Sequence, residues 1–183
     1  MSGKVDLSRF NNSWYKPGGI GRRALWFVVG RVFVNTYLPW PMCLKRLVLR
    51  CFGAQLGRGV IIKPKVNIKY PWFLSVGDHV WVGECVWIDN LGKVTIGSHV
   101  ALSQGAMLLC GNHDYKKETF DLIVGEITIE DGAWIGAQAV VCPGVTVRGH
   151  AILSVGSVAT KELEGYGIYQ GNPAAKFRER IIQ

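Results

Sequence analysis

Aliphatic side chains recur with a period of six residues along the C-terminal two thirds of the chain. Fourteen positions share this register: Leu56, Ile62, Ile68, Val76, Val82, Ile88, Ile96, Leu102, Leu108, Ile129, Ile135, Val141, Val147 and Leu153. Two insertions of two residues and one long excursion interrupt the register, and each follows a group of three repeats. Three repeats per group indicate three flat faces per coil, so the pattern predicts a parallel β-helix of stacked coils.

A second set of positions, four residues after the first, carries small or β-branched side chains that fit the inside of a narrow prism. This set comprises Val60, Val66, Val80, Val86, Val100, Ala106, Ala133, Ala139, Val145, Ala151 and Ser157. Between the faces we expect turns with positive φ, in the pairs Gly77-Asp78, Gly97-Ser98, Asp131-Gly132, Pro143-Gly144 and Arg148-Gly149.

Three histidines, His79, His99 and His150, occupy equivalent turn positions. His79 and His99 lie one coil apart and could stack. A zinc site of three histidines would need another nearby, and Glu118 stands where a second histidine of the excursion would have to be. We interpret the three as turn residues, and we predict that no metal is required.

The first third of the chain differs in composition from the repeat. Residues 1–69 carry thirteen Lys and Arg against one acid, whereas residues 70–183 carry eight against twelve. Residues 41–52 predict a short helix, with Lys45, Arg46 and Arg50 lying off its apolar face. That face is expected to consist of Leu44, Leu47, Val48, Cys51 and Phe52. The helix either packs on the main domain or, with the nearby tryptophans, rests on anionic lipid headgroups or a lipid-linked phosphate.

Three segments follow from these patterns. Residues 1–55 form a basic, partly helical extension, residues 56–165 form the β-helix with an excursion loop at 111–126, and residues 166–183 form a C-terminal tail. The apolar stretch 24–38 is interrupted and too short to span a bilayer. Five widely spaced cysteines without a signal peptide indicate free thiols and a cytoplasmic protein.

The excursion is the strongest candidate for a functional site, because it is a polar loop on a rigid scaffold. It contains His113, flanked by Asn112 and Asp114. One coil earlier, Asp89 and Asn90 are expected to lie beneath Leu109 and Cys110. A carboxylate beside an imidazole is typical of a general-base dyad, which can activate a hydroxyl for acyl transfer. Cys110 as an acyl-accepting thiol is the alternative, but its place beside a repeat position favours a packed thiol.

Several motifs together resemble those of the hexapeptide-repeat acyltransferases, in the branch of galactoside, maltose and nodulation acetyltransferases, and especially the colanic-acid biosynthesis type. They are Cys51 to Ala54, YPW at 70–72, VGECVWIDNLGKVTIG at 82–97, GNHDY at 111–115, EDGAWIGAQAVVCPGVTV at 130–147 and GNPAAKFRER at 171–180. The resemblance covers the whole chain. It implies an all-β, left-handed parallel β-helix that forms a homotrimer and transfers acetyl from acetyl-CoA.

The resemblance also implies roles for individual residues. His113 would be the general base, helped by Asp89, and coenzyme A would lie between neighbouring subunits. On the cofactor side, the resemblance implies that Trp134 shapes the active site and that Ala137 and Val155 contact coenzyme A through their backbones. Thr160 and Lys161 would flank the lower part of the pantetheine arm, and Arg178 would contact the nucleotide phosphates. We place Cys85, Asn90 and Asn112 in the acceptor site. Galactoside-type relatives carry Asn at the position of Cys85, which points to a different acceptor.

These observations favour an O-acetyltransferase acting on a sugar of an exopolysaccharide or capsule precursor. The acceptor would be a sugar or oligosaccharide, in a lipid-linked form suited to the inner membrane face and the basic N-terminal third. Alternatives are acetylation of a xenobiotic such as an antibiotic, a non-catalytic β-helix scaffold, and a carbonic-anhydrase-like metalloenzyme. The net charge of +8 comes with no nucleic-acid-binding motif, so we expect no nucleic-acid partner.

Overall fold

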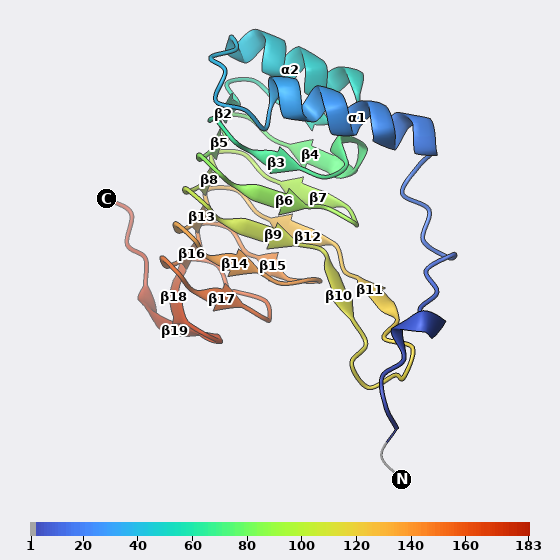
Figure 1. Cartoon of the computed structure of the whole chain (residues 1–183). Helices are drawn as coiled ribbons and strands as arrows, with labels where there is room; N and C mark the ends of the chain where they lie inside the picture. Colours follow the sequence, from blue (N-terminus) through green and yellow to red (C-terminus); the bar gives the residue numbers. More distant parts are fainter. Residues whose placement is uncertain (1–2) are drawn as a thin grey trace.

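The computed structural model describes residues 3–183 as a three-sided stack of coils built from parallel sheets (Figure 1). Sheet A contains β1 (Gln55–Leu56), β4 (Leu74–Val76), β7 (Val94–Ile96), β12 (Ile127–Ile129) and β15 (Thr146–Val147). Sheet B contains β2 (Ile61–Ile62), β5 (Trp81–Val82), β8 (Ala101–Leu102), β13 (Trp134–Ile135), β16 (Ile152–Leu153), β18 (Gly167–Gly171) and β19 (Ala174–Glu179). Sheet C contains β3 (Asn67–Ile68), β6 (Trp87–Asp89), β9 (Met107–Leu109), β14 (Val140–Val141) and β17 (Val158–Ala159).

Successive coils are held together by backbone hydrogen bonds. Gln55 pairs with Ser75 one coil later, and Val94 pairs with Ile127 across the excursion, so the inserted residues do not disturb the register. The strands are only two or three residues long over most of the stack. Their stability therefore comes from neighbouring coils, as in other solenoids.

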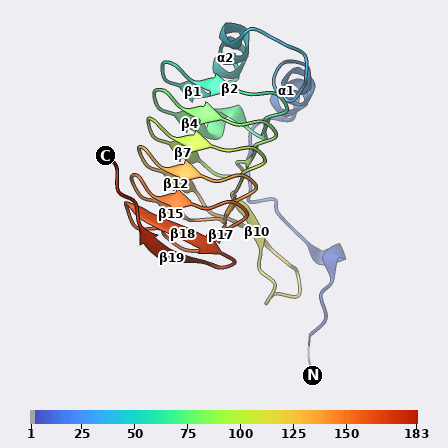
Figure 2. The ribbon, with the colours of Figure 1, turned by 90° about the vertical axis from the view of Figure 1, so that its left-hand side faces the viewer.

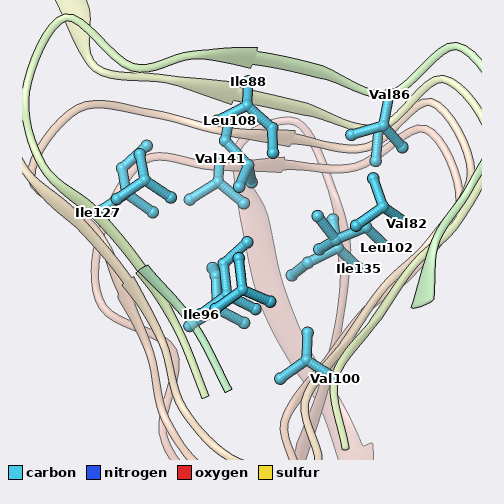
Figure 3. Packing of buried hydrophobic residues seen from close by; sticks show 14 of the residues in the cluster. Val82, Val86, Ile88, Ile96, Val100, Leu102, Leu108, Ile127, Ile135 and Val141 are labelled. Carbon is cyan, nitrogen blue, oxygen red and sulfur yellow. The ribbon is translucent and has the colours of Figure 1, made fainter. Parts of the chain in front are cut away.

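The predicted core positions form the interior. Of the fourteen repeat positions, all except the partly buried Leu56 are buried, and all eleven positions of the second set are buried. Figure 3 shows how equivalent side chains stack in columns from coil to coil, for example Ile88, Leu108 and Val141. The six-residue periodicity thus predicted the inward-facing residues correctly.

At three of the five predicted turns, the residue with positive φ is not the one expected. Positive φ occurs at Gly132 and Gly144, as expected. At the other three predicted pairs it falls on the residue that follows the pair, namely His79 (56°), His99 (59°) and His150 (60°). At Gly77 the reason for glycine is space, because an added Cβ would lie 2.8 Å from the backbone carbon of Gly97 in the next coil. As predicted, His79 and His99 stack, with ring centroids 5.3 Å apart.

Two helices, α1 (Ile20–Phe33) and α2 (Met42–Cys51), cover the first coil, at the end of the stack opposite the C-terminal strands (Figures 1 and 2). Trp26 of α1 is buried, and its Nε1 donates a hydrogen bond to the Ile68 carbonyl at 2.9 Å. No helix within residues 3–183 is long and apolar enough to cross a bilayer.

The predicted apolar face of α2 was correct only in part: Val48 and Phe52 pack against the core, and Leu44 is partly buried. Leu47 and Cys51 are exposed, whereas Lys45 and Leu49 are buried. The reason is that Lys45 extends under the helix and donates from Nζ to the Ile62 carbonyl at 3.2 Å. Burial lowers the pKa of this ammonium group, and its aliphatic stem serves as core material.

The C-terminal residues form an antiparallel hairpin. Strand β18 adds to sheet B beside β16, and β19 turns back along it to form the last strand of the sheet. Two short 3₁₀ helices, η1 (Leu7–Arg9) and η2 (Pro71–Phe73), complete the regular elements together with the β10–β11 hairpin of the excursion.

Asn90 is expected to be a structural residue of the stack. It is fully buried, its Oδ1 accepts from the Tyr70 amide at 2.9 Å, and its Nδ2 donates to the Tyr70 carbonyl at 2.6 Å. Asn90→Ala would leave both backbone groups unpaired, and we predict a loss of about 2–4 kcal/mol in the free energy of unfolding. Urea denaturation measures it, with the exposed Asn112→Ala as control. Equal stability of the two variants would contradict the assignment.

Candidate active site

The excursion folds as a β-hairpin that projects from the corner between sheets C and A (Figure 1). Strands β10 (Gly111–His113) and β11 (Leu122–Val124) pair antiparallel, with His113 opposite Leu122. At the tip, Asp121 accepts hydrogen bonds from Lys117 Nζ at 2.9 Å and Thr119 Oγ1 at 2.7 Å, and these bonds lower the pKa of its carboxyl. The loop that carries His113 therefore has a defined conformation.

The imidazole of His113 is oriented by the backbone of its own hairpin. Its Nδ1 lies 2.9 Å from the Phe120 carbonyl oxygen. Because a carbonyl oxygen can only accept, Nδ1 must carry the proton, which leaves the lone pair of Nε2 able to take up another. The ring also stacks on Phe120, with centroids 4.5 Å apart and planes 6° from parallel. The arrangement presents one basic nitrogen in a fixed direction.

The N-terminal segment crosses the hairpin and forms part of the site. The Asp6 amide donates to the Glu118 carbonyl at 2.9 Å, and the Arg9 guanidinium lies 2.9 Å from the Glu118 carboxylate. Phe10 contacts the imidazole, with ring centroids 5.7 Å apart. Further along, the Tyr15 hydroxyl donates to the Leu91 carbonyl at 2.6 Å, and burial strongly raises the pKa of this phenol. Residues 6–17 are thus tied to the corner that holds His113.

Asp89 does not form the predicted dyad with His113. Its carboxylate Oδ1 lies 2.8 Å from Lys69 Nζ, and its backbone pairs with Leu109 as expected. The two residues of this ion pair occupy equivalent positions one coil apart, which brings the opposite charges together. The tautomer of His113 is set by the Phe120 carbonyl instead.

The three residues predicted for the acceptor site lie in different places. Asn112 is exposed beside His113, and its Oδ1 accepts from the His113 amide at 2.8 Å. Asn90 is buried with its amide fully engaged, so it is not available to a substrate. Cys85 is exposed at the corner between sheets B and C, which is a different corner of the prism from that of His113.

Cys110 has the properties of a packed thiol. Its side chain is buried, and burial raises the pKa of the thiol to about 11. Almost no thiolate is therefore present at neutral pH, and the thiolate is the reactive form. The structure supports the packed interpretation over an acyl-accepting one.

The residues predicted to hold coenzyme A follow sheet B and its corner with sheet C. Trp134 is 45% exposed, and its Nε1 donates to Ser103 Oγ at 2.8 Å. Val155 is 71% exposed one coil below Ala137, whose carbonyl accepts from the Gly156 amide at 2.9 Å. This surface offers an exposed aromatic ring and backbone groups along a corner, which fits an extended, mostly apolar arm.

The cationic residues predicted for the cofactor lie on the last coils. Thr160 and Lys161 are exposed after β17, and Arg178 is exposed on β19. Solvent-facing cations suit the phosphates of a nucleotide. His113 lies at a different corner of the prism from Ala137 and Val155, so a single chain does not bring the predicted base and the predicted cofactor surface together.

Sequence reasoning missed four contributors to the His113 region: Tyr15, Arg23, Lys69 and the Phe120 carbonyl. Lys69 could have been found, because it precedes Asp89 by one full coil in the same register. The Phe120 carbonyl leaves no side-chain signal. Tyr15 and Arg23 belong to a segment outside the repeat, where no register predicts contacts. Over the described part of the chain, no group of three or more His, Cys, Asp and Glu converges as a metal site would require.

Comparison with known proteins identifies the family. The chain is 36% identical over 181 residues to the protein named "Putative colanic acid biosynthesis acetyltransferase WcaF" of Escherichia coli K12, covering 96% of this chain and 97% of that protein. The chain belongs to this acetyltransferase family. It is also 32% identical over 132 residues to nodulation protein L of Rhizobium meliloti, covering 70% and 72% of the two chains. No protein-family profile matches the sequence.

A solved structure confirms the fold. The hexapeptide-repeat acetyltransferase VCA0836 of Vibrio cholerae, in complex with acetyl-coenzyme A, matches with a TM-score of 0.79 at 22% identity, over 91% of this chain and 93% of that one. The predicted left-handed β-helix is therefore correct. The predicted acetyltransferase class is also correct, on the evidence of the Escherichia coli relative. The expected donor, acetyl-CoA, agrees with the ligand of the Vibrio protein.

Proposed function

We propose that this acetyltransferase moves an acetyl group from acetyl-CoA to a hydroxyl of a sugar in an exopolysaccharide precursor, with His113 as general base. The observation that carries the proposal is the Nδ1 contact with the Phe120 carbonyl, which leaves Nε2 as the proton acceptor. The name of the Escherichia coli relative, a colanic acid biosynthesis enzyme, supports an exopolysaccharide acceptor.

The chemistry needs no covalent enzyme intermediate, because a thioester is already an activated acyl donor. His113 Nε2 removes the proton as the acceptor oxygen attacks the thioester carbonyl carbon. The tetrahedral intermediate then expels the coenzyme A sulfur, and the imidazolium returns the proton to it as a thiol. The Phe120 carbonyl, rather than Asp89, stabilises the imidazolium through Nδ1–H.

His113→Ala tests the base. The variant should retain the fold and lose ~10² or more in kcat, because general-base catalysis contributes about that much. Thiol release from acetyl-CoA measures turnover on sugars, nucleotide sugars and lipid-linked oligosaccharides. Asp89→Asn is the matched comparison, since Asp89 faces Lys69 and its replacement should cost far less activity than that of His113. Turnover unchanged in His113→Ala would assign the base elsewhere.

The same assay separates the alternative functions. Turnover on an antibiotic hydroxyl and on no sugar would support the xenobiotic enzyme. Absence of turnover and of coenzyme A binding would support a scaffold. The orientation of His113 by its own hairpin favours an enzyme, because a scaffold does not require a base with a directed lone pair.

The active site is best explained as a site between subunits of a homotrimer. The outward side chains of sheet A are polar, whereas sheets B and C expose Trp81, Trp87 and Trp134. Large exposed aromatic groups on neighbouring faces are typical of subunit contacts. A cyclic head-to-tail contact could join the His113 corner of one chain to the Ala137 corner of the next.

Mixed trimers test the shared site. His113→Ala and Ala137→Trp should each be inactive alone, the second because a bulky side chain blocks the cofactor surface. When the two are co-expressed, about a quarter of the sites would combine an intact His113 with an intact Ala137 from the neighbouring chain. Activity should return to that level, and light scattering should give a trimeric mass. A monomeric mass, or no recovery, would show that each site is built within one chain.

The N-terminal third also supports peripheral contact with the cytoplasmic face of the inner membrane. Helix α1 exposes Ile20, Leu25, Phe27, Val28 and Val32. These lie in the segment with thirteen basic residues against one acid. An apolar face with a cationic surround favours the interface of an anionic bilayer.

Vesicle sedimentation tests this contact. The protein should bind phosphatidylglycerol vesicles and not phosphatidylcholine vesicles, and Leu25→Glu with Val28→Glu should abolish binding by placing charge on the apolar face. Ile181→Glu, at an equally exposed apolar position near the C-terminus, is the control and should bind normally. Equal binding by the α1 variant would show that the helix does not face the lipid.

A further inference from the structure

A groove of about 890 Å³ lies between the N-terminal segment and the corner of the prism that carries His113. Its outer wall comes from residues 10–19, and its inner wall includes Tyr70, Leu91 and Leu122. Figure 1 shows the N-terminal segment running from α1 to the hairpin. The groove is thus bounded by segments far apart in the sequence and contains the catalytic imidazole.

The groove is cationic. Lys16, Arg23 and Lys69 line it, and its lining residues include no Asp or Glu. Lys69 is paired with Asp89, which does not line the groove but lines a second cavity beneath α1. Lys16 and Arg23 have no carboxylate within ion-pair distance anywhere in residues 3–183.

Arg23 carries a second sign of a missing partner. Its Nε is buried and donates no hydrogen bond within the described chain. A buried guanidinium N–H without an acceptor is unfavourable unless a ligand supplies one. The planar guanidinium matches the oxygens of a phosphate in geometry as well as in charge.

A second cavity, of about 330 Å³, continues from the groove beneath α1. Arg23, Lys69 and Tyr70 line both spaces, so these side chains lie at the junction. The second cavity adds the side chains of Trp26, Phe27 and Trp87. A ligand that extends from His113 would therefore meet the cations first and an aromatic surface next.

We propose that Arg23, together with Lys16 and Lys69, binds a phosphate or diphosphate attached to the acceptor sugar, and so selects glycosyl-phosphate acceptors. The sugar hydroxyl lies at His113, the phosphoryl group at the cationic junction, and the group beyond it under α1. This inference rests on the proposed function, because it places the acceptor at His113. A free sugar without the phosphoryl group would place no anion beside these three cations.

Calorimetric titration with inorganic pyrophosphate tests the site without requiring turnover. The full-length protein is first saturated with coenzyme A, so that the cofactor's own phosphate contacts are occupied. Wild type should bind pyrophosphate, and Arg23→Gln should weaken binding by ~10-fold or more, since charge and fork geometry are both lost. Lys4→Gln, which removes a positive charge outside the groove, should bind as wild type does.

His113→Ala separates this inference from the proposed function. The variant should bind pyrophosphate normally, because the imidazole is not needed to hold phosphate. If His113→Ala keeps its turnover while Arg23→Gln loses pyrophosphate, the base assignment fails and the phosphate site stands. No binding by wild type, or equal binding by wild type and Arg23→Gln, would overturn the phosphate site.

Competition experiments distinguish the two sources of such a phosphate. A nucleoside diphosphate sugar and a short-chain polyprenyl diphosphate in detergent micelles are each titrated against bound pyrophosphate. Tighter competition by the polyprenyl compound would identify a lipid-linked acceptor. Tighter competition by the nucleotide sugar would identify a nucleotide-linked, water-soluble acceptor. In either case Arg23→Gln should reduce the affinity of the competitor, and failure to do so would overturn the assignment.

Discussion

The backbone hydrogen bonds between successive coils are the constraint on which the rest of the structure depends. Each strand is too short to be stable alone, so every coil must align with its neighbours. This alignment explains why Gly77 is glycine and why an excursion between Cys110 and Ile127 leaves the register intact. A rigid stack can thus carry a long insertion at one corner and hold His113 at a defined position along the coils.

The orientation of the His113 imidazole is controlled locally. The hairpin folds back so that one of its own carbonyls, at Phe120, fixes the tautomer of His113. A histidine base is commonly oriented by a carboxylate, but the nearby carboxylate of Asp89 forms an ion pair with Lys69 of the preceding coil instead. The N-terminal segment then packs against this corner: Asp6 bonds to Glu118, Phe10 contacts His113, and Tyr15 bonds to Leu91. These contacts make the hairpin part of the wall of a groove.

The distribution of functional groups links assembly to specificity. His113 and the expected cofactor surface lie at different corners of the prism, and the proposed trimer would bring them together from neighbouring chains. The cations, by contrast, come from the same chain as His113. Acceptor selection would therefore belong to the chain that supplies the base, and donor binding to the interface.

The sequence alone determined the coils, the inward-facing residues and the excursion with His113, because a six-residue period is a local property that survives without knowledge of contacts. It also contained the Lys69–Asp89 and Tyr70–Asn90 contacts, since their partners occupy equivalent positions in adjacent coils. Only the tertiary structure decided that Lys45 is buried, that a backbone carbonyl orients His113, and that Arg23 and Tyr15 lie near the corner that holds His113. A backbone oxygen has no residue type to recognise, and a segment outside the repeat has no register from which its neighbours could be predicted.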